Sequence, residues 1–226
     1  DGIYRKSLNF NIRIINSFNN IYSTHFDGVD DFVDIGVSGM SSVKTTGSIS
    51  AWVKLETITS SGNVFQVRVD SNNNIALLYN ASTNELNFKY RGSGSNATAT
   101  YATTIENDEN WHHLAGTWDT SEDRVRLYLD GAEVGTATGL TAITGSFASC
   151  SIGSNSDGGA FWKGNIDEVV LFNRELSGTD ISSLYNDGMP FNPPPLSNDG
   201  ANWIKGYWRM GDGGIVGNPI ATYPTI

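Results

Sequence analysis

Three histidines and a few carboxylates are the side chains of this sequence best suited to acid–base or metal chemistry. His112 and His113 are adjacent in an expected strand, where neighbouring side chains point to opposite faces, so they are not expected to chelate one ion. His25 is the only other histidine, which leaves a zinc site or a histidine-dependent triad without enough members. We therefore predict structural roles for the histidines.

The carboxylates argue against a glycosidase, because a retaining enzyme needs two carboxyl groups about 5–5.5 Å apart. The nearest candidates, Glu106 and Glu109, lie in a polar stretch outside the expected strands. The glycine-rich residues 92–97 have the spacing of a dinucleotide-binding fingerprint, but a strand pattern follows them instead of the helix that the fingerprint requires. The sequence thus predicts a protein that is not an enzyme.

Basic and amide side chains form the strongest candidate binding surface. Five of them occupy the outward positions of two expected strands, namely Gln66, Arg68, Asn87, Lys89 and Arg91. Because the two strands belong to one apparent meander, these side chains could share a face that suits an anionic sugar, with a stacking aromatic beside them. Trp52 and Tyr128 have the same outward parity in other strands. The alternative is that outward positions are polar in any sheet and that Lys and Arg there prevent aggregation.

The elements that carry these residues are strands. Apolar and polar residues alternate over 49–55, 65–70, 86–91 and 124–129, with Asn- and Gly-rich turns between them, as in an antiparallel sandwich. One short helix is expected after Ser177. Ser177 can act as its N-cap, and the side chain of Asp180 can complete a capping box by accepting the backbone N–H of Ser177. Gly188 lies where a C-terminal cap would fall. The pattern predicts an all-β, two-sheet antiparallel jelly-roll sandwich with one short helix near the C-terminal end of the domain.

The sequence divides into three parts. Residues 1–23 read as an N-terminal arm, residues 24–190 as the sandwich domain, and residues 191–226 as a Pro-rich linker with a C-terminal strand that could begin a further module. Both flanking segments are expected to contact protein partners. The formal net charge of −10 argues against a nucleic-acid partner, and the absence of a long apolar run argues against membrane insertion.

Six segments occur in order within residues 24–190: FDGVDDFVDI (26–35), SISAWVK (48–54), NWHHLAGTWD (110–119), RLYLDG (126–131), GNIDEVVLFNR (164–174) and LYNDG (184–188). Together they resemble the laminin-G-like branch of the concanavalin A-like lectin/glucanase superfamily, in the style of marine phage virion and bacterial surface proteins. The resemblance implies a curved jelly roll that binds glycans or proteins, often with a structural calcium ion.

The resemblance also implies where calcium would bind. Asp27 and Gly28, near the first strand of the domain, and Asp167, just before an apolar strand, match positions at which relatives bring two strand starts together. Calcium takes 6–8 oxygen ligands from carboxylates, carbonyls and water. The alternative is that Asp27 and Gly28 form only a turn and that Asp167 is a solvated edge residue.

These observations favour a non-catalytic, lectin-like binding module that recognises a glycan or cell-surface polymer. The alternative is a structural or decoration protein of a virion or surface appendage, in which the jelly roll serves assembly or adhesion. Either reading places the protein outside the cell or on a virion surface.

Overall fold

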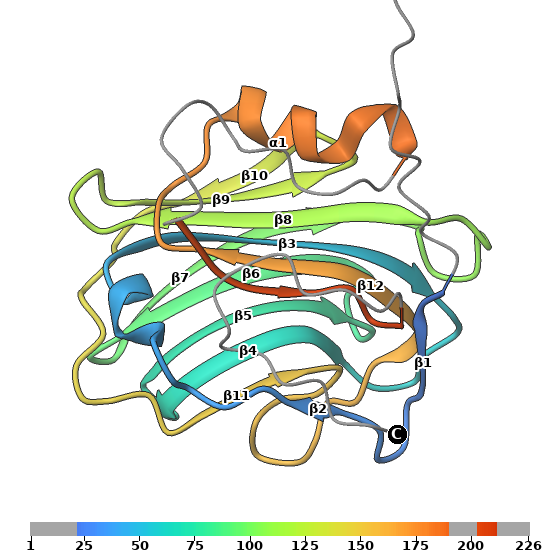
Figure 1. Cartoon of the computed structure of the whole chain (residues 1–226), viewed down its shortest axis with the longest axis horizontal. Coiled ribbons are helices and arrows are strands. Elements are labelled where there is room, and N and C mark those ends of the chain that lie inside the picture. The colour runs from blue at the N-terminus through green and yellow to red at the C-terminus, as the bar shows by residue number, and fades with distance from the viewer. Residues whose placement is uncertain (1–21, 190–202, 212–226) are drawn as a thin grey trace, which may run out of the picture.

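The computed structural model describes residues 22–189 and 203–211, which form two antiparallel sheets packed face to face (Figure 1). Sheet A has the order β1 (Thr24–Asp27), β12 (Lys163–Phe172), β3 (Thr46–Leu55), β8 (His112–Asp119), β9 (Arg124–Leu129) and β10 (Ala132–Ala137), and β13 (Ile204–Trp208) also pairs with β12. Sheet B has the order β2 (Val33–Asp34), β11 (Ser149–Ile152), β4 (Gly62–Asp70), β5 (Asn73–Asn80), β6 (Glu85–Gly92) and β7 (Ser95–Ala102). The prediction of an all-β jelly-roll sandwich is confirmed.

The core lies between the sheets, where the apolar residues of each alternating strand meet. Ile49 and Val53 of β3 are fully buried there, as are Val125 and Leu127 of β9. Phe88 of sheet B packs against Trp118 of sheet A, with ring centroids 5.8 Å apart.

Gly116 in β8 permits that close approach. A Cβ atom at this position would lie 2.3 Å from the ring of Phe88, which is far inside van der Waals contact. The aromatic packing between the sheets therefore depends on the missing side chain.

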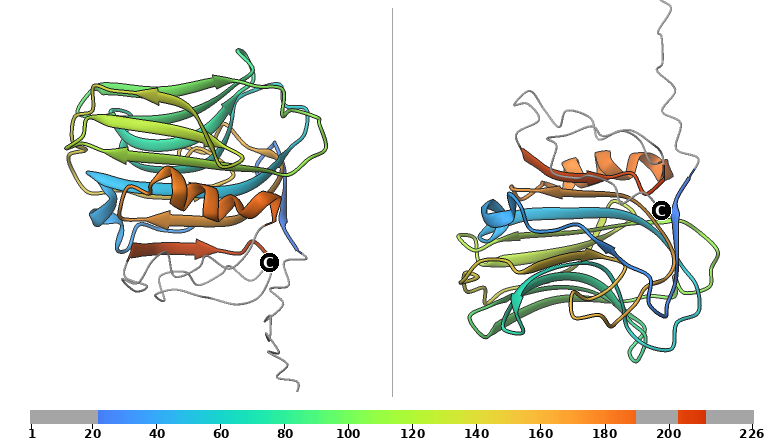
Figure 2. Two further views of the ribbon diagram at one scale, coloured as in Figure 1. Left: turned by 90° about the horizontal axis from the view of Figure 1, so that it is seen from above. Right: turned by 60° about the horizontal axis from the view of Figure 1, so that its bottom comes forward.

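Helix α1 (Gly178–Tyr185) covers the outer face of sheet A. Ser177 and Asp180 form the predicted capping box. The C-cap, however, is Asn186, which adopts a left-handed conformation two residues before Gly188. Short 3-10 helices occur at Met40–Val43 and Asn186–Gly188. Figure 2 shows α1 on the same side of the sandwich as β13 and away from β4–β7. No helix in the described part of the chain is long and apolar enough to cross a membrane.

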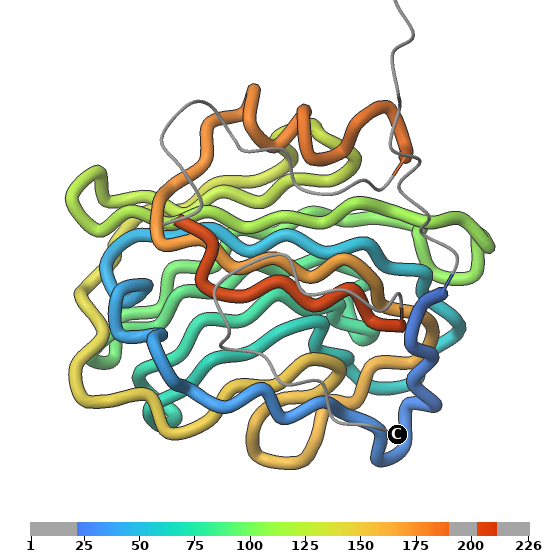
Figure 3. The backbone as a smooth tube through the Cα atoms, viewed as in Figure 1, coloured from blue at the N-terminus to red at the C-terminus, as the bar shows by residue number. Residues whose placement is uncertain are grey.

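The C-terminal strand differs from the predicted domain division. We expected the strand after the Pro-rich linker to lie outside residues 24–190, but β13 pairs with β12 and extends sheet A (Figure 3). Tyr207 and Trp208 are buried on opposite faces of the sheet, Trp208 in the main core and Tyr207 beneath α1. This burial makes residues 203–211 part of the sandwich. Residues 1–21, 190–202 and 212–226, which include most of the predicted arm and the linker, lie outside the described residues.

Candidate functional site

The outer face of sheet B brings together all five predicted ligand-binding residues. Phe65 and Val67 of β4, like Phe88 and Tyr90 of β6, point into the core, so the residues between them face outward. Antiparallel register aligns these outward residues in three rows across β4, β5 and β6. The rows are Arg68, Asn74 and Arg91; then Gln66, Ala76 and Lys89; then Asn63, Leu78 and Asn87.

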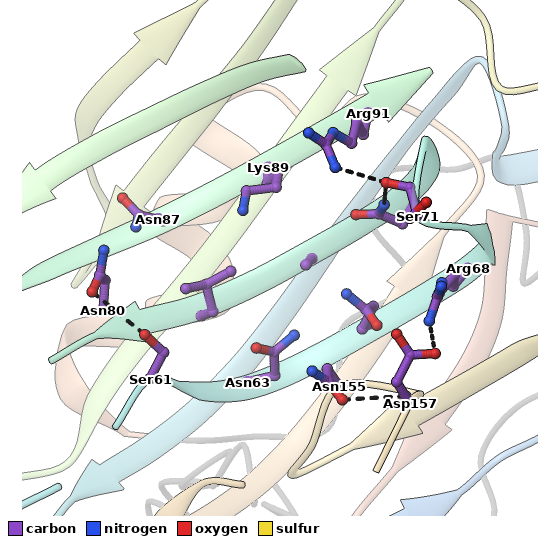
Figure 4. A pocket seen from close by; sticks show the side chains of 14 residues that line it. Ser61, Asn63, Arg68, Ser71, Asn80, Asn87, Lys89, Arg91, Asn155 and Asp157 are labelled. Atoms are coloured by element: carbon purple, nitrogen blue, oxygen red, sulfur yellow. Dashed lines mark hydrogen bonds and ion pairs between the residues drawn. The ribbon is translucent and has the colours of Figure 1, made fainter. Parts of the chain in front are cut away.

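These rows form a depression of about 330 Å³, which we call the sheet B depression (Figure 4). Ala76 and Leu78 supply its apolar floor, and polar side chains supply its sides. One wall comes from the loop between β11 and β12, which contributes Asn155 and Asp157. An apolar floor with several polar groups around it is a common arrangement in ligand sites.

The depression carries a positive charge, because its described lining holds three cations, Arg68, Lys89 and Arg91, and one acidic side chain, Asp157. Arg68 forms an ion pair with Asp157, and one guanidinium nitrogen of Arg91 donates to the Ser71 carbonyl at 2.7 Å. The ammonium group of Lys89 has no hydrogen bond or ion pair with any described residue. Desolvation, and then the neighbouring charge of Arg91, lowers the pKa of Lys89. Lys89 is therefore the cation best placed to receive an anionic group.

Amide groups complete the depression. The side-chain oxygen of Gln66 accepts hydrogen bonds from the backbone nitrogen and the hydroxyl of Ser156, at 3.0 and 2.9 Å, which fixes the loop wall. Asn87 is only 7% exposed, and its side-chain oxygen has no hydrogen-bond partner among the described residues. Buried polar atoms in folded proteins nearly always have a partner. A ligand or water in the depression would supply one for Asn87.

The predicted stacking aromatic is absent from this site. Trp52 and Tyr128 have the outward parity that the sequence suggested, but they belong to sheet A and are buried beneath α1. Trp52 stacks on Tyr185 of the helix, with ring centroids 5.9 Å apart and planes at 22°. No aromatic side chain lines the sheet B depression among the described residues.

Sequence reasoning missed several residues of the depression, and the reasons are structural. A register irregularity between Asn63 and Phe65 turns Asn63 outward, whereas simple alternation assigns it to the core. Asn74 precedes the nearly continuous apolar run of β5, which hides the alternation there. Asp157 reaches the site only because β11 pairs with β4.

The predicted calcium ligands do not converge. Asp27 pairs with Lys163 in the register of β1 and β12, four residues from Asp167, which corresponds to about 13 Å along a strand. Asp167 is buried, and its carboxylate accepts the backbone N–H of Glu168 at 2.8 Å. The prediction that Asp27 and Asp167 meet is therefore wrong, because their strands are paired in a different register.

Asp27 has other acidic neighbours, since carboxylate oxygens of Asp27, Asp30 and Asp31 lie within 4.8 Å of one another. One carboxylate oxygen of Asp27 accepts the N–H of Val29 at 2.7 Å, which closes a tight turn through Gly28. Gly28 has a φ of +80°, and a Cβ there would collide with Lys163. Three carboxylates could supply part of a calcium coordination sphere, so the oxygen donors fit such an ion without Asp167.

The two adjacent histidines have separate environments, as predicted. His112 contacts Asp130 at 2.8 Å through one ring nitrogen and Asp108 at 2.7 Å through the other, and these partners raise its pKa. His113 is buried beneath α1, where one ring nitrogen lies 2.7 Å from the hydroxyl of Ser50. Burial lowers the pKa of His113 to about 4. Neither arrangement exposes a nucleophile or a metal site.

Comparisons with known proteins agree with the fold. The Ruminococcus gnavus sialidase module CBM40 superposes with a TM-score of 0.57 at 11% identity, over 74% of this chain and all of that one. Domains LG4-5 of the mouse laminin α1 chain superpose with a TM-score of 0.53 at 19% identity, over 69% of this chain and 44% of that one. The leech intramolecular trans-sialidase gives 0.59 at 13% identity, over 74% of this chain and 28% of that one.

At these identities, the structural likeness establishes the fold alone. No curated protein sequence matches the chain. A family model described as the concanavalin A-like lectin/glucanases superfamily, of the laminin G type, matches residues 27–182, which is more than half of the sequence. The chain therefore belongs to the concanavalin A-like lectin/glucanase superfamily.

Proposed function

We propose that this protein is a non-catalytic carbohydrate-binding module that holds an anionic glycan or surface polymer in the sheet B depression. The observation that carries the proposal is the ammonium of Lys89, which has no partner among the described residues and lies between amide groups and beside Arg91 on a sheet face that no described helix or strand covers. A carboxylate or sulfate of a sugar would accept charge-assisted hydrogen bonds from both residues. The side-chain amides of Asn87 and Gln66 line the same depression and would contact sugar hydroxyls.

Structures of similar proteins support the proposal of an acidic sugar ligand. Two solved structures of the Ruminococcus gnavus module contain α2,3- and α2,6-sialyllactose, which are acidic sugars because sialic acid carries a carboxylate. A module of this kind would work outside the cell, where glycans and surface polymers are exposed. The sheet B depression offers the charge that such ligands require.

A non-catalytic role fits the positions of the candidate acids. Glu106 accepts the backbone N–H of Ile58 at 2.8 Å and the hydroxyl of Tyr79 at 3.2 Å, so its oxygens already serve to hold a loop. The sheet B depression contains a single carboxylate, that of Asp157, which is paired with Arg68. Glycoside hydrolysis needs two carboxyl groups, and the described lining of the sheet B depression supplies one.

The test is a calorimetric titration of the whole chain with sialyllactose, an oligogalacturonate and a heparin oligosaccharide. Lys89→Gln and Arg91→Gln should each weaken binding about tenfold or more, because a hydrogen bond to a charged group contributes about 1.5–3 kcal/mol. Raising the salt concentration should weaken wild-type binding as well.

Arg126→Gln is the matched control. This residue faces Glu133 and Glu175 on sheet A, at 3.4 and 3.8 Å, so its loss removes the same charge from the other face. Affinity should stay as in the wild type. The proposal fails if none of the three acidic sugars binds, or if the Lys89 and Arg91 variants bind as tightly as the wild type.

A further inference from the structure

A second hollow lies at the loop end of the sandwich, on elements that take no part in the sheet B depression. It has a volume of about 490 Å³ and lies between the end of β3, the start of β12 and the loop that joins β7 to β8. Its lining residues are Lys54, Leu55, Glu56, Thr57, Asn107, Glu109 and Lys163, and we call it the loop-end depression.

The loop of residues 103–111 is firmly held beside this depression. The side chain of Asn107 accepts the N–H of Thr57 at 3.0 Å and donates to its hydroxyl, while the backbone N–H of Asn107 donates to the Leu55 carbonyl at 3.1 Å. Farther along, Asp108 contacts His112 at 2.7 Å. The loop is therefore held at Asn107 and at Asp108, which fixes the position of the residues that follow, Glu109 to Trp111.

Two features of the loop raise the free energy of the folded chain when no ligand is bound. Glu109 has a φ of +62°, a left-handed conformation that a side chain other than glycine rarely adopts. Trp111 keeps 40% of its surface exposed although it is a large aromatic residue. Strained backbone and exposed aromatic surface on a well-anchored loop are typical of a site that contacts a ligand.

Trp111 follows two residues after Glu109, which lines the loop-end depression. The register of β3 and β8 ends with Val53 opposite His112, and one further residue in the same antiparallel register would bring Trp111 beside Lys54. The side chains of Lys54, Glu109 and Lys163 have no hydrogen bond or ion pair with other described residues, whereas the side chain of Glu56 contacts His25 at 3.0 Å. The depression thus combines free polar side chains with an exposed aromatic ring on the adjoining loop.

We propose that Trp111 and the loop-end depression form a second saccharide site, which binds a neutral sugar ring. The apolar face of a hexose would lie on the indole of Trp111, and its hydroxyls would meet the carboxylate of Glu109 and the ammonium groups of Lys54 and Lys163. The two lysines and two glutamates balance in charge, unlike the basic sheet B depression, so no net charge favours an anionic ligand here. A protein partner would need a far larger contact area than one exposed ring beside a small hollow.

The experiment titrates the full chain with neutral hexasaccharides of glucose, galactose and mannose and follows binding by calorimetry. At least one sugar should bind, and Trp111→Ala should weaken that binding tenfold or more, while Trp111→Phe should retain most of it. Glu109→Gln should weaken binding by a smaller factor. Tyr101→Ala is the matched control, since Tyr101 is a 38% exposed aromatic on β7, and it should bind as the wild type.

Three results would overturn this proposal: no neutral hexasaccharide binds, Trp111→Ala binds like the wild type, or Trp111→Ala alters the oligomeric state in solution. The last result would show that the ring contacts protein instead. Lys89→Gln separates this site from the proposed function, because it should leave neutral-sugar binding unchanged while weakening acidic-sugar binding. Failure at one site therefore remains distinguishable from failure at the other.

Discussion

The strands of both sheets show the same alternating sequence pattern, but the outer faces of the two sheets differ in how far they are buried. Several outward residues of sheet A, including Trp52 and His113, are buried beneath α1. Outward residues of sheet B, including Gln66 and Lys89, line a depression that no described helix or strand covers. Strand alternation assigns a residue to a face, but a covering element decides whether that face becomes part of the core or meets a ligand.

The side-chain types on each outer face agree with whether that face is covered by a helix. Beneath α1, aromatic rings stack, and the polar group of His113 contacts Ser50. In the three outward rows of sheet B, the side chains other than Ala76 and Leu78 are amides and cations, which are well solvated at a protein surface and can bind polar ligands. Sheet A therefore uses its outer face for stability, and we propose that sheet B uses its outer face for recognition.

The largest loss of stability should come from shortening a side chain that α1 covers on sheet A. Trp52→Ala removes a buried ring that contacts both Tyr185 and His113, and it should lower the free energy of unfolding by about 3–5 kcal/mol. Lys89→Ala, on the open face, should cost less than about 1 kcal/mol. Urea denaturation of both variants measures the difference. Equal losses would contradict the division between a stability face and a recognition face.

Acid should weaken the covered face specifically. The pKa of His113 is about 4 in the folded protein and about 6.5 when unfolded, so folding favours the neutral ring. The associated stability is present above pH 6.5 and is lost as the pH falls toward 4, by about 3 kcal/mol in total. Denaturation at a series of pH values should show this loss, and His113→Gln should lack that component of it.

His112 should respond to pH in the opposite direction. Its pKa is raised by Asp130 and Asp108, so its contribution is present below pH 6.5 and is lost as the pH rises through the folded value. Subtracting the pH profile of His112→Gln from that of the wild type isolates this contribution. A difference that grew with rising pH would show that the two carboxylates do not stabilise the charged ring.

Calcium should act at the end of β1, outside both faces. If Asp27, Asp30 and Asp31 bind the ion with an affinity of about 0.1–1 mM, about 10 mM calcium should stabilise the fold by about 1–3 kcal/mol. Thermal melts with calcium and with EDTA measure this shift. Asp31→Asn should reduce it, while Asp167→Asn should preserve the calcium response even if the variant melts earlier. Identical melts of the wild type in calcium and EDTA would exclude the site.

The smallest expected effect concerns the wall of the sheet B depression. Asp157→Ala frees Arg68 from its ion pair and removes the one carboxylate among the described residues that line the site. Affinity for an acidic oligosaccharide should rise by a factor on the order of two to five, since exposed ion pairs contribute at most about 1 kcal/mol. Weaker binding by this variant would show that the ion pair shapes the site for the ligand.

Much of this arrangement could be predicted from local patterns. Alternation in β4 and β6 was enough to group Gln66, Arg68, Asn87, Lys89 and Arg91 on one face, because hairpin neighbours share a sheet. The capping box of α1 was also visible, since Ser177 and Asp180 are three residues apart. These features depend on residues that are close in sequence.

Features that depend on distant pairing could not be predicted in this way. The register of β1 against β12 separates Asp27 from Asp167, and β13 joins sheet A after a segment of about thirty residues. The position of α1 over Trp52 likewise follows from packing between distant segments. Such contacts leave no periodic signal in one sequence, because each partner retains its own local pattern.

The most direct test of the central claim is a map of nuclear magnetic resonance shifts in the ¹⁵N-labelled chain on titration with an acidic oligosaccharide, using sialyllactose and an oligogalacturonate in turn. Our account predicts that the largest changes occur at the side-chain amides of Gln66 and Asn87 and at the backbone amides of β5 and β6. The indole signal of Trp52 should stay unchanged. Shifts that gather around α1 and sheet A, or no shifts with either sugar, would contradict the assignment of ligand binding to the open face of sheet B.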